Sequence, residues 1–163
     1  QGVTVSLVLV GEGSEREKLE AIRTELGLEK QVVLTGFRED VAAFYKASDI
    51  FASPSEFEGF LIAQLEAMYC GLPCVVSRNV PLLELASQAS LVCETTAEDI
   101  ALKLSDLLTN DALRDRLTFA APLIAKPHTM QHYAVTLHSY YRALLGDIPF
   151  DDITSPIWRG QAG

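Results

Sequence analysis

The sequence lacks the features of a membrane-spanning, secreted or nucleic-acid-binding protein. No apolar run reaches the roughly 20 residues that a helix needs to cross a bilayer, and the N-terminus does not resemble a signal peptide. Positive charge is scarce, since 13 lysines and arginines stand against 22 aspartates and glutamates, for a formal net charge of −9. Such a balance repels nucleic acids and anionic membranes. We therefore expect no nucleic-acid partner and no direct membrane span.

Cysteine is scarce as well, with three residues at Cys70, Cys74 and Cys93. An odd number without a framework pattern does not indicate a disulfide scaffold. Cys70 and Cys74 also lack the spacing and the partners of a zinc site. We expect reduced, buried thiols and a cytoplasmic protein, which a preceding domain could attach to a membrane.

The length and composition predict one compact, folded domain. The chain has 163 residues, of which 48% are hydrophobic and 21% charged, and it contains no internal repeat. This size suits one α/β domain and is too small for two. Periodicity disappears after Gly146, so we expect a domain over 1–146 and a C-terminal tail over 147–163. Because the chain begins directly on a strand, we expect a fragment whose first strand and loop lie upstream.

Short apolar runs alternate with segments of helical periodicity along the chain. This alternation predicts a doubly wound α/β fold with a parallel sheet of the Rossmann-like type. The expected strands are Val3–Val10, Val32–Leu34, Ile50–Ala52, Cys74–Val76 and Leu91–Cys93.

Capping patterns locate the expected helices. In the first, Ser14 and Glu17 form a capping box and Gly27 ends the helix. Thr96 and Asp99 open a later helix in the same way, and a further helix is expected over about 129–145. The predicted inward-facing residues of the first two helices are Leu19, Ile22 and Leu26, and then Ile100, Leu104, Leu107 and Leu108.

The stretch from Ser53 to Pro73 is the most informative. It reads as a strand end, a glycine turn and a helix that is apolar nearly all round, as in a helix covered on every side. A buried carboxylate costs several kcal/mol unless it is hydrogen-bonded or lies in a ligand cleft. We therefore expect Glu66 to be buried and to serve a ligand.

Glu58 and Glu66 are eight positions apart, which on a helix corresponds to roughly 12 Å along the axis. They cannot form a close acid/base pair, and a retaining hydrolase pair would lie about 5 Å apart. A helix N-terminus lies between them, and Gly59 lets the backbone approach an anion closely. The arrangement suits a ligand with hydroxyls at both ends and phosphate in the middle, as in a nucleotide-sugar.

At this point the sequence resembles the retaining GT-B glycosyltransferases called glycosyl transferases group 1. The resemblance rests on the Glu-x7-Glu motif from Glu58 to Glu66, with the flanking Glu58-Gly-Phe and Glu66-Ala-Met-x-x-Gly71-x-Pro73. Supporting motifs are Val10-Gly-Glu-Gly13, Val33-Leu-Thr-Gly-Phe37 and Ala47-Ser-Asp-Ile-Phe51. Together they cover roughly residues 5 to 145 and form a fairly specific ordered set.

The resemblance implies the C-terminal, donor-binding domain of a glycosyltransferase of the hexosyltransferase type, with a role in polysaccharide biosynthesis. Glu58 would be the catalytic residue and bind hydroxyls of the donor sugar, Glu66 would bind the ribose, and the loop from Gly36 to Arg38 would lie beside the base. The donor-binding residues implied are Glu58, Gly59, Phe60, Leu61, Glu66, Gly11, Gly13, Gly36, Phe37 and Arg38. An acceptor-binding N-terminal domain of the same protein would be the partner, so we expect the chain alone to be inactive.

The resemblance also implies retention of the anomeric configuration, with the donor diphosphate assisting the acceptor. No Asp-x-Asp motif occurs in the sequence. This fits a fold in which a helix dipole and basic side chains, rather than a metal ion, handle the leaving diphosphate. We therefore expect no metal ion and no cofactor besides the nucleotide-sugar substrate.

Two local departures from the family pattern keep alternatives open. Leu61 stands where the family has glycine, and Asn79-Val80-Pro81 replaces the usual Gly-Gly loop. The family's basic pair, an Arg and a Lys, would lie upstream of Gln1. The alternatives are a nucleotide-sugar epimerase of the same fold, or a non-catalytic nucleotide-binding or scaffold domain.

Overall fold

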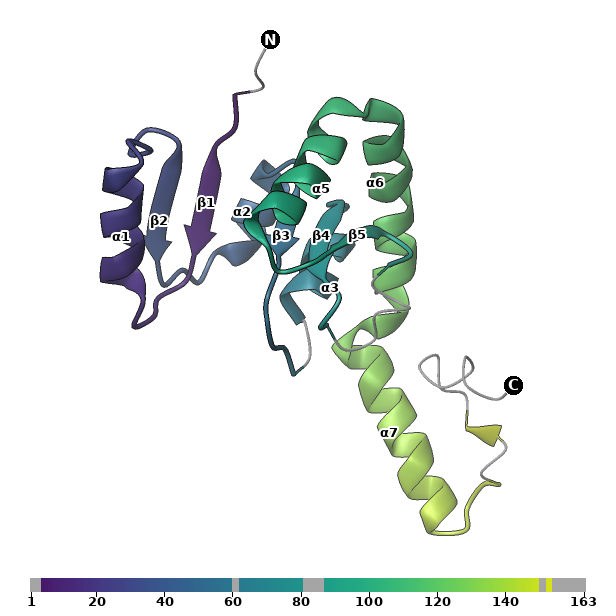
Figure 1. Ribbon diagram of the computed structural model, residues 1–163. Coiled ribbons are helices and arrows are strands. Elements are labelled where there is room, and N and C mark those ends of the chain that lie inside the picture. The colour runs from purple at the N-terminus through teal and green to yellow at the C-terminus, as the bar shows by residue number, and fades with distance from the viewer. Residues whose placement is uncertain (1–3, 60–61, 81–86, 150–151, 154–163) are drawn as a thin grey trace. The chain divides into compact units, whose positions relative to one another are not determined.

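The structure, a computed structural model, describes residues 4–59, 62–80, 87–149 and 152–153. The chain forms two compact units, residues 1–47 and 48–163. Figure 1 shows the elements of both units in chain order.

The first unit consists of two parallel strands, their connecting helix and one further helix. Its elements are β1 (Leu7–Val10), α1 (Arg16–Glu25), β2 (Val32–Gly36) and α2 (Val41–Ala47). The strands pair in parallel, with Leu7 beside Val32 and Leu9 beside Leu34. This is the strand–helix–strand unit that the alternating pattern predicted.

Helix α1 departs from its predicted packing and its predicted start. None of its residues is buried, and the expected inward stripe is exposed at Leu19, Ile22 and Leu26. A two-stranded sheet offers too little surface to cover a ten-residue helix. The Ser14–Glu17 capping box is also wrong, because the helix begins after Glu15 without a side-chain cap.

The predicted end of α1 at Gly27 is confirmed. Gly27 has φ +64°, and its N–H donates to the carbonyl of Thr24 at 3.1 Å, while Leu28 N–H donates to Arg23 at 2.9 Å. These two bonds form a Schellman motif, in which a left-handed residue closes the last helical turn. Glycine adopts that conformation without the steric cost that a Cβ would add.

The second unit holds a three-stranded parallel sheet with β4 in the centre. Its strands are β3 (Phe51–Ser53), β4 (Cys74–Ser77) and β5 (Ser90–Cys93), in the order β3-β4-β5. All four residues of β4 are buried. Its helices are α3 (Ile62–Tyr69), α5 (Ala97–Thr109), α6 (Asp111–Ala125) and α7 (Met130–Leu144), with a short 3₁₀ helix, η1 (Lys126–His128), before α7.

The core of this unit lies where α5 and α6 meet the sheet. Val75 of β4, Cys93 of β5, Leu107 of α5 and Leu117 of α6 are buried against one another. The predicted inner face of α5 is confirmed, since Ile100 and Leu104 pack on this cluster and Leu107 lies inside it. Burying one such side chain contributes about 1.5–3 kcal/mol, so the cluster fixes the sheet that carries the site.

The helix starts predicted at Thr96 and Thr129 are confirmed. The Thr96 hydroxyl accepts a hydrogen bond from Asp99 N–H at 3.4 Å, and Thr129 does the same for His132 at 3.3 Å. The return bond of the Thr96–Asp99 capping box differs from the expected one, because the Asp99 carboxylate accepts from Glu94 N–H at 2.7 Å instead of from Thr96 N–H. Asp99 thereby ties the end of β5 to the start of α5.

Parallel strands joined by helices confirm the predicted α/β class, here in two sheets. The predicted boundary at Gly146 stays a prediction, and most of the tail over 147–163 lies outside the described residues. Among the helices that the structure describes, none combines the length and the apolarity needed to cross a membrane.

Candidate functional site

Glu58 lies in the turn that leaves the carboxyl end of β3, and a serine hydroxyl holds its carboxylate. Ser55 Oγ donates to Glu58 Oε1 at 2.9 Å, and Ser53 Oγ lies 3.2 Å from Ser55 Oγ. Glu58 is half-buried, and Gly59 beside it is exposed. The turn therefore presents a carboxylate at the sheet edge where open parallel sheets bind their ligands.

The last residue of β4, Ser77, holds the same turn by a hydrogen bond. The Ser77 side chain is fully buried, and its hydroxyl donates to the carbonyl of Ser55 at 2.5 Å. Asn79 N–H in turn donates to Ser77 Oγ at 3.3 Å. The turn that carries Glu58 is thus bonded to a buried strand next to β3.

Glu66 lies on α3, and the expectation that it is buried is wrong. Ile62, Glu66 and Tyr69 are exposed, whereas Ala67 and Met68 are buried. Helix α3 therefore has one covered face and one open face, because β3, β4 and α6 pack on one side of it. Its largely apolar composition did not distinguish the two faces. An exposed Glu66 is accessible to a ligand but does not require one.

The predicted 12 Å axial separation between Glu58 and Glu66 does not apply, because helix α3 begins only at Ile62. Glu58 precedes the helix by four residues and lies in the turn. The predicted helix start between the two glutamates is confirmed. Phe60 and Leu61, the remaining predicted donor-binding residues of this segment, lie outside the described residues.

In the first unit, the structure brings Gly11 and Gly36 together at the ends of β1 and β2. Gly11 N–H donates to the Gly36 carbonyl at 3.0 Å. Gly36 has φ +71°, and a Cβ there would lie 3.0 Å from Glu12 Oε2 and 3.4 Å from Arg16 Nη1. Both the backbone conformation and the neighbouring charges therefore favour glycine at this position.

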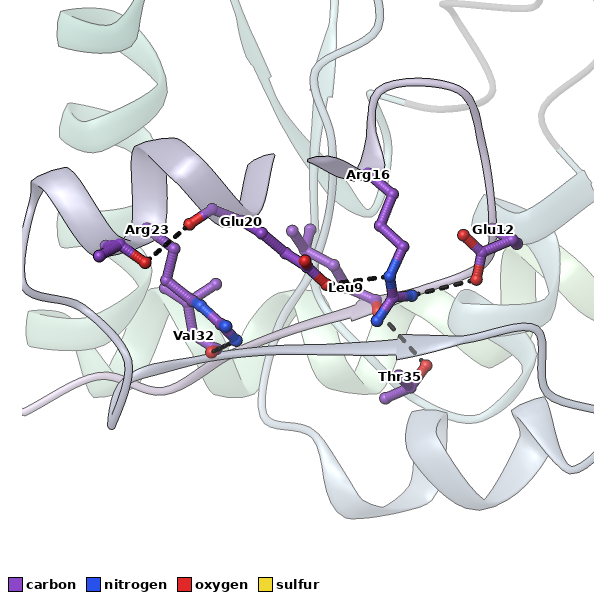
Figure 2. A network of polar contacts seen from close by, with 8 residues as sticks. Leu9, Glu12, Arg16, Glu20, Arg23, Val32 and Thr35 are labelled. Atoms are coloured by element: carbon purple, nitrogen blue, oxygen red, sulfur yellow. Dashed lines mark hydrogen bonds and ion pairs between the residues drawn. The ribbon is translucent and has the colours of Figure 1, made fainter. Parts of the chain in front are cut away.

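A network of charged side chains lies beside Gly36. Arg16 donates through Nη1 to Glu12 and through Nε to Glu20, each at 3.0 Å, as Figure 2 shows. Arg16 N–H also donates to the Gly13 carbonyl at 3.2 Å. Arg16 therefore links the loop that holds the predicted residues Gly11 and Gly13 to the first turn of α1.

Phe37 and Arg38 follow Gly36 and are both exposed. The Arg38 guanidinium binds both carboxylate oxygens of Asp40 at 2.9 Å and lies over the ring of Phe44, 5.4 Å from its centroid. Hydrogen bonding between the two raises the pKa of Arg38 and lowers the pKa of the Asp40 carboxyl. The Arg38 guanidinium is already bonded to Asp40, so the main-chain groups of this loop are more available to a ligand than the Arg38 charge.

The three cysteines are free, as predicted. Cys74 and Cys93 are buried, whereas Cys70 is half-buried. Burial raises the pKa of the Cys74 thiol to about 12. In the described segments, no three His, Cys, Asp or Glu side chains gather as metal ligands would, and the expected absence of a metal ion stays a prediction.

The predicted site residues thus fall into two groups, one in each unit. Gly11, Gly13, Gly36, Phe37 and Arg38 belong to the first, and Glu58, Gly59 and Glu66 to the second. That the two groups form one donor site stays a prediction.

Sequence reasoning missed Ser55, Ser77 and Arg16. The one available signal was a serine closing the apolar run of β4, at a position that another valine would fill in an ordinary buried strand.

The model of the family described as Glycosyl transferases group 1 matches residues 1–123. The D-inositol 3-phosphate glycosyltransferase of Corynebacterium jeikeium (strain K411) is 33% identical over 137 residues, which covers 81% of this chain and 33% of that protein. The UDP-Gal:alpha-D-GlcNAc-diphosphoundecaprenol alpha-1,3-galactosyltransferase of Escherichia coli is 44% identical over 71 residues, 43% of this chain and 18% of that protein. The chain therefore spans a third or less of the length of these relatives.

Solved structures show the same fold. HepE from Anabaena in complex with UDP-glucose has a TM-score of 0.71 and 26% identity, covering 88% of this chain and 41% of that one. The sucrose-phosphate synthase of Thermosynechococcus elongatus has a TM-score of 0.78 and 24% identity, covering 88% and 39%. The second likeness concerns the fold alone.

Proposed function

The chain belongs to the glycosyl transferases group 1 family and has the α/β fold of GT-B glycosyltransferases, and from this premise we propose that it is the donor-binding half of a sugar-transferring enzyme. The enzyme would move a hexose from a nucleotide-sugar to an acceptor hydroxyl, with retention, in polysaccharide biosynthesis. The acceptor would be held by an N-terminal domain of the same protein.

One observation carries the proposal: a held carboxylate lies at the carboxyl edge of a parallel sheet, directly before a helix. Glu58 follows β3, and Ser55 takes only one of its oxygens. Helix α3 begins four residues later. A helix N-terminus favours a diphosphate through its free N–H groups and its dipole, while a carboxylate accepts hydrogen bonds from sugar hydroxyls. A carboxylate next to a helix N-terminus therefore suits a ligand in which a sugar is bonded to a diphosphate.

We propose the roles of the other residues from the family resemblance. We assign the hexose hydroxyls to Glu58 and the ribose to the exposed Glu66. The diphosphate would lie against the segment 59–61 and the N-terminus of α3. Contacts of Gly11, Gly13 and the loop Gly36–Arg38 with the nucleotide stay an expectation from the family resemblance. The complex of the related HepE with UDP-glucose supports a nucleotide-sugar as the ligand class.

In the proposed reaction, Glu58 orients the sugar and acts as neither nucleophile nor close partner of Glu66. Its negative charge beside the sugar stabilises positive charge that develops at the anomeric carbon, because a fixed opposite charge costs no reorganisation during reaction. The leaving diphosphate would be stabilised by the helix N-terminus without a metal ion. The free thiols support a cytoplasmic location, where cysteines stay reduced.

Binding calorimetry on the full-length protein tests this function. The probes are UDP and GDP, then UDP-glucose, UDP-galactose and GDP-mannose, and turnover of the bound donor is followed with an acceptor mixture. We expect tight binding of one nucleotide series and release of its nucleoside diphosphate, with NMR showing an unchanged anomeric configuration in the product. Interconversion of sugars without an acceptor would indicate an epimerase instead. Absence of nucleotide binding would indicate a scaffold domain and refute the proposal.

A further inference from the structure

We propose that Ser55, clamped by Ser77, is a positioning residue that sets the Glu58 carboxylate for the donor sugar. The inference rests on the proposed function, because it concerns the same carboxylate. Neither serine would touch the substrate in this role. Each acts through the next group in the chain Ser77, Ser55, Glu58.

The direction of the hydrogen bonds can be worked out from proton counting. An ionised carboxylate only accepts, so Ser55 must donate to Glu58 Oε1 at 2.9 Å. A serine hydroxyl has one proton, and Ser55 has used it. The 3.2 Å contact with Ser53 is therefore a bond that Ser53 donates and Ser55 accepts. Each bond in such a directed chain polarises the next, which strengthens the donation to Glu58.

Ser77 fixes the backbone from which this chain projects. Its hydroxyl donates to the Ser55 carbonyl at 2.5 Å from a residue that is 0% exposed, at the end of a fully buried strand. Asn79 N–H donates to the same oxygen at 3.3 Å, so both sides of the hydroxyl are engaged. A buried hydroxyl bonded in this way has one preferred orientation. Ser55 is thus held at its backbone by Ser77 and at its side chain by Ser53 and Glu58.

The two carboxylate oxygens of Glu58 therefore have different roles in this proposal. Within the described part of the chain, Ser55 is the one hydrogen-bond donor to this carboxylate, and it occupies Oε1. We assign the second oxygen to the ligand, with the carboxylate already ordered before the ligand arrives. Ordering in advance increases affinity because the side-chain entropy is not lost on binding.

A purely structural role for these serines would look different, and the chain offers a matched control. Ser90 is also a buried serine in a hydrogen bond, since it accepts from Gln64 Nε2 at 3.0 Å. It lies at the opposite end of the sheet from Ser77, because in the strand register Ser90 pairs with Cys74. Ser90→Ala removes a comparable buried bond that goes to Gln64 on α3 rather than to the turn that carries Glu58.

The experiment measures the affinity of the full-length protein for UDP and for UDP-glucose, or for GDP and GDP-mannose if the wild type prefers guanine. For Ser55→Ala we expect about a tenfold loss of nucleotide-sugar affinity, the low end for a hydrogen bond to a charged group, with the nucleoside diphosphate within about twofold. Ser55→Thr keeps the hydroxyl and should restore sugar affinity. Ser77→Ala should reproduce the loss in part, and Ser90→Ala should lower the melting temperature without it.

The outcomes separate this inference from the proposed function. If the wild type binds a nucleotide-sugar and Ser55→Ala binds it equally well, the positioning role is refuted and the proposed function stands. Equal losses for the nucleotide-sugar and the diphosphate would also refute it, as would a sugar-selective loss in Ser90→Ala. If the wild type binds neither ligand, both proposals fall together. Should Ser77→Ala fail to fold, the pair Ser55→Ala and Ser55→Thr decides the question.

Discussion

Replacing Glu58 by alanine should weaken binding of the complete nucleotide-sugar while leaving the nucleoside diphosphate nearly unchanged. The carboxylate has one oxygen bonded to Ser55 and a second that we assign to the sugar. A hydrogen bond to a charged group contributes about 1.5–3 kcal/mol, which corresponds to roughly tenfold to a hundredfold in affinity. UDP carries no hexose, so its affinity should change by less than about twofold if Glu58 contacts the sugar alone.

The fold should survive this substitution. Glu58 is half-buried and lies in a turn rather than in the core, and among the described residues its hydrogen-bond donor is Ser55. The freed Ser55 hydroxyl, itself half-buried, can bond to water, so the cost in unfolding free energy should be about 1 kcal/mol or less. Circular dichroism and a thermal melt check this before affinity is interpreted.

The assay is calorimetric titration of UDP and UDP-glucose into wild type, Glu58→Ala and a matched control, Glu56→Ala. Glu56 is an exposed residue of the same turn and carries the same charge, so its removal reproduces the electrostatic change alone. We expect Glu56→Ala to bind both ligands like the wild type. Equal affinities of Glu58→Ala and wild type for UDP-glucose would refute the reasoning, and so would equal losses in the two variants.

Four further outcomes are expected. Glu66→Ala should weaken UDP and UDP-glucose alike, by about tenfold or more if this carboxylate binds the ribose, and its exposure means that stability should change by less than about 0.5 kcal/mol. Gly36→Ala should destabilise the protein by about 1–3 kcal/mol in denaturant titrations, because φ is +71° and the new Cβ would lie 3.0 Å from the Glu12 carboxylate, whereas Gly13→Ala meets nothing within 4 Å and should be milder. Burial raises the pKa of Cys74 from 9.0 to about 12, so the folded state keeps a proton that the unfolded chain loses above pH 9. The resulting contribution to stability is present below pH 9 and declines between pH 9 and 12 by at most about 1.4 kcal/mol per pH unit. This pH dependence should be absent in Cys74→Ala. The chain of 163 residues alone should show no sugar transfer with any donor, and turnover by it would contradict the assignment of the acceptor to another domain.

The strands could be predicted from the sequence because each is a short apolar run between turn residues. Val32–Leu34 and Cys74–Val76 were expected, and β2 and β4 contain them with one or two further residues. Gly27 and Thr96 were recognised because a left-handed helix end and a hydroxyl cap depend on a few neighbouring residues only. Local chemistry therefore predicted the elements and several of their ends.

The errors concern interactions that the local pattern does not determine. Glu66 was expected to be buried because its helix is apolar, yet packing by β3, β4 and α6 covers only one side of that helix. Ser14 was expected to cap α1, but Glu15 pairs with Lys18 at 2.9 Å and the helix begins after it.

The support of the candidate site could not be predicted for a related reason. The bond from Ser77 to the Ser55 carbonyl joins residues 22 positions apart and requires β3 and β4 to be adjacent. A serine at the end of an apolar run indicates a nearby hydrogen-bond acceptor, but the sequence does not identify that acceptor. Glu58 was recognised through the motif, whereas the groups that hold it needed three-dimensional contacts.

The parallel course of β3, β4 and β5 has a consequence for engineering. The chain leaves these strands after Ser53, Ser77 and Cys93, all at one edge of the sheet, while the hydrophobic cluster around Val75 and Leu107 stabilises the unit from behind the strands. The exposed residues Glu56, Phe57, Gly59, Arg78 and Asn79 can therefore be randomised with little effect on packing, because loops at such an edge tolerate change better than the scaffold. A library restricted to these exposed positions, with Ser55 and Glu58 kept, is a compact starting point for retuning sugar preference by directed evolution.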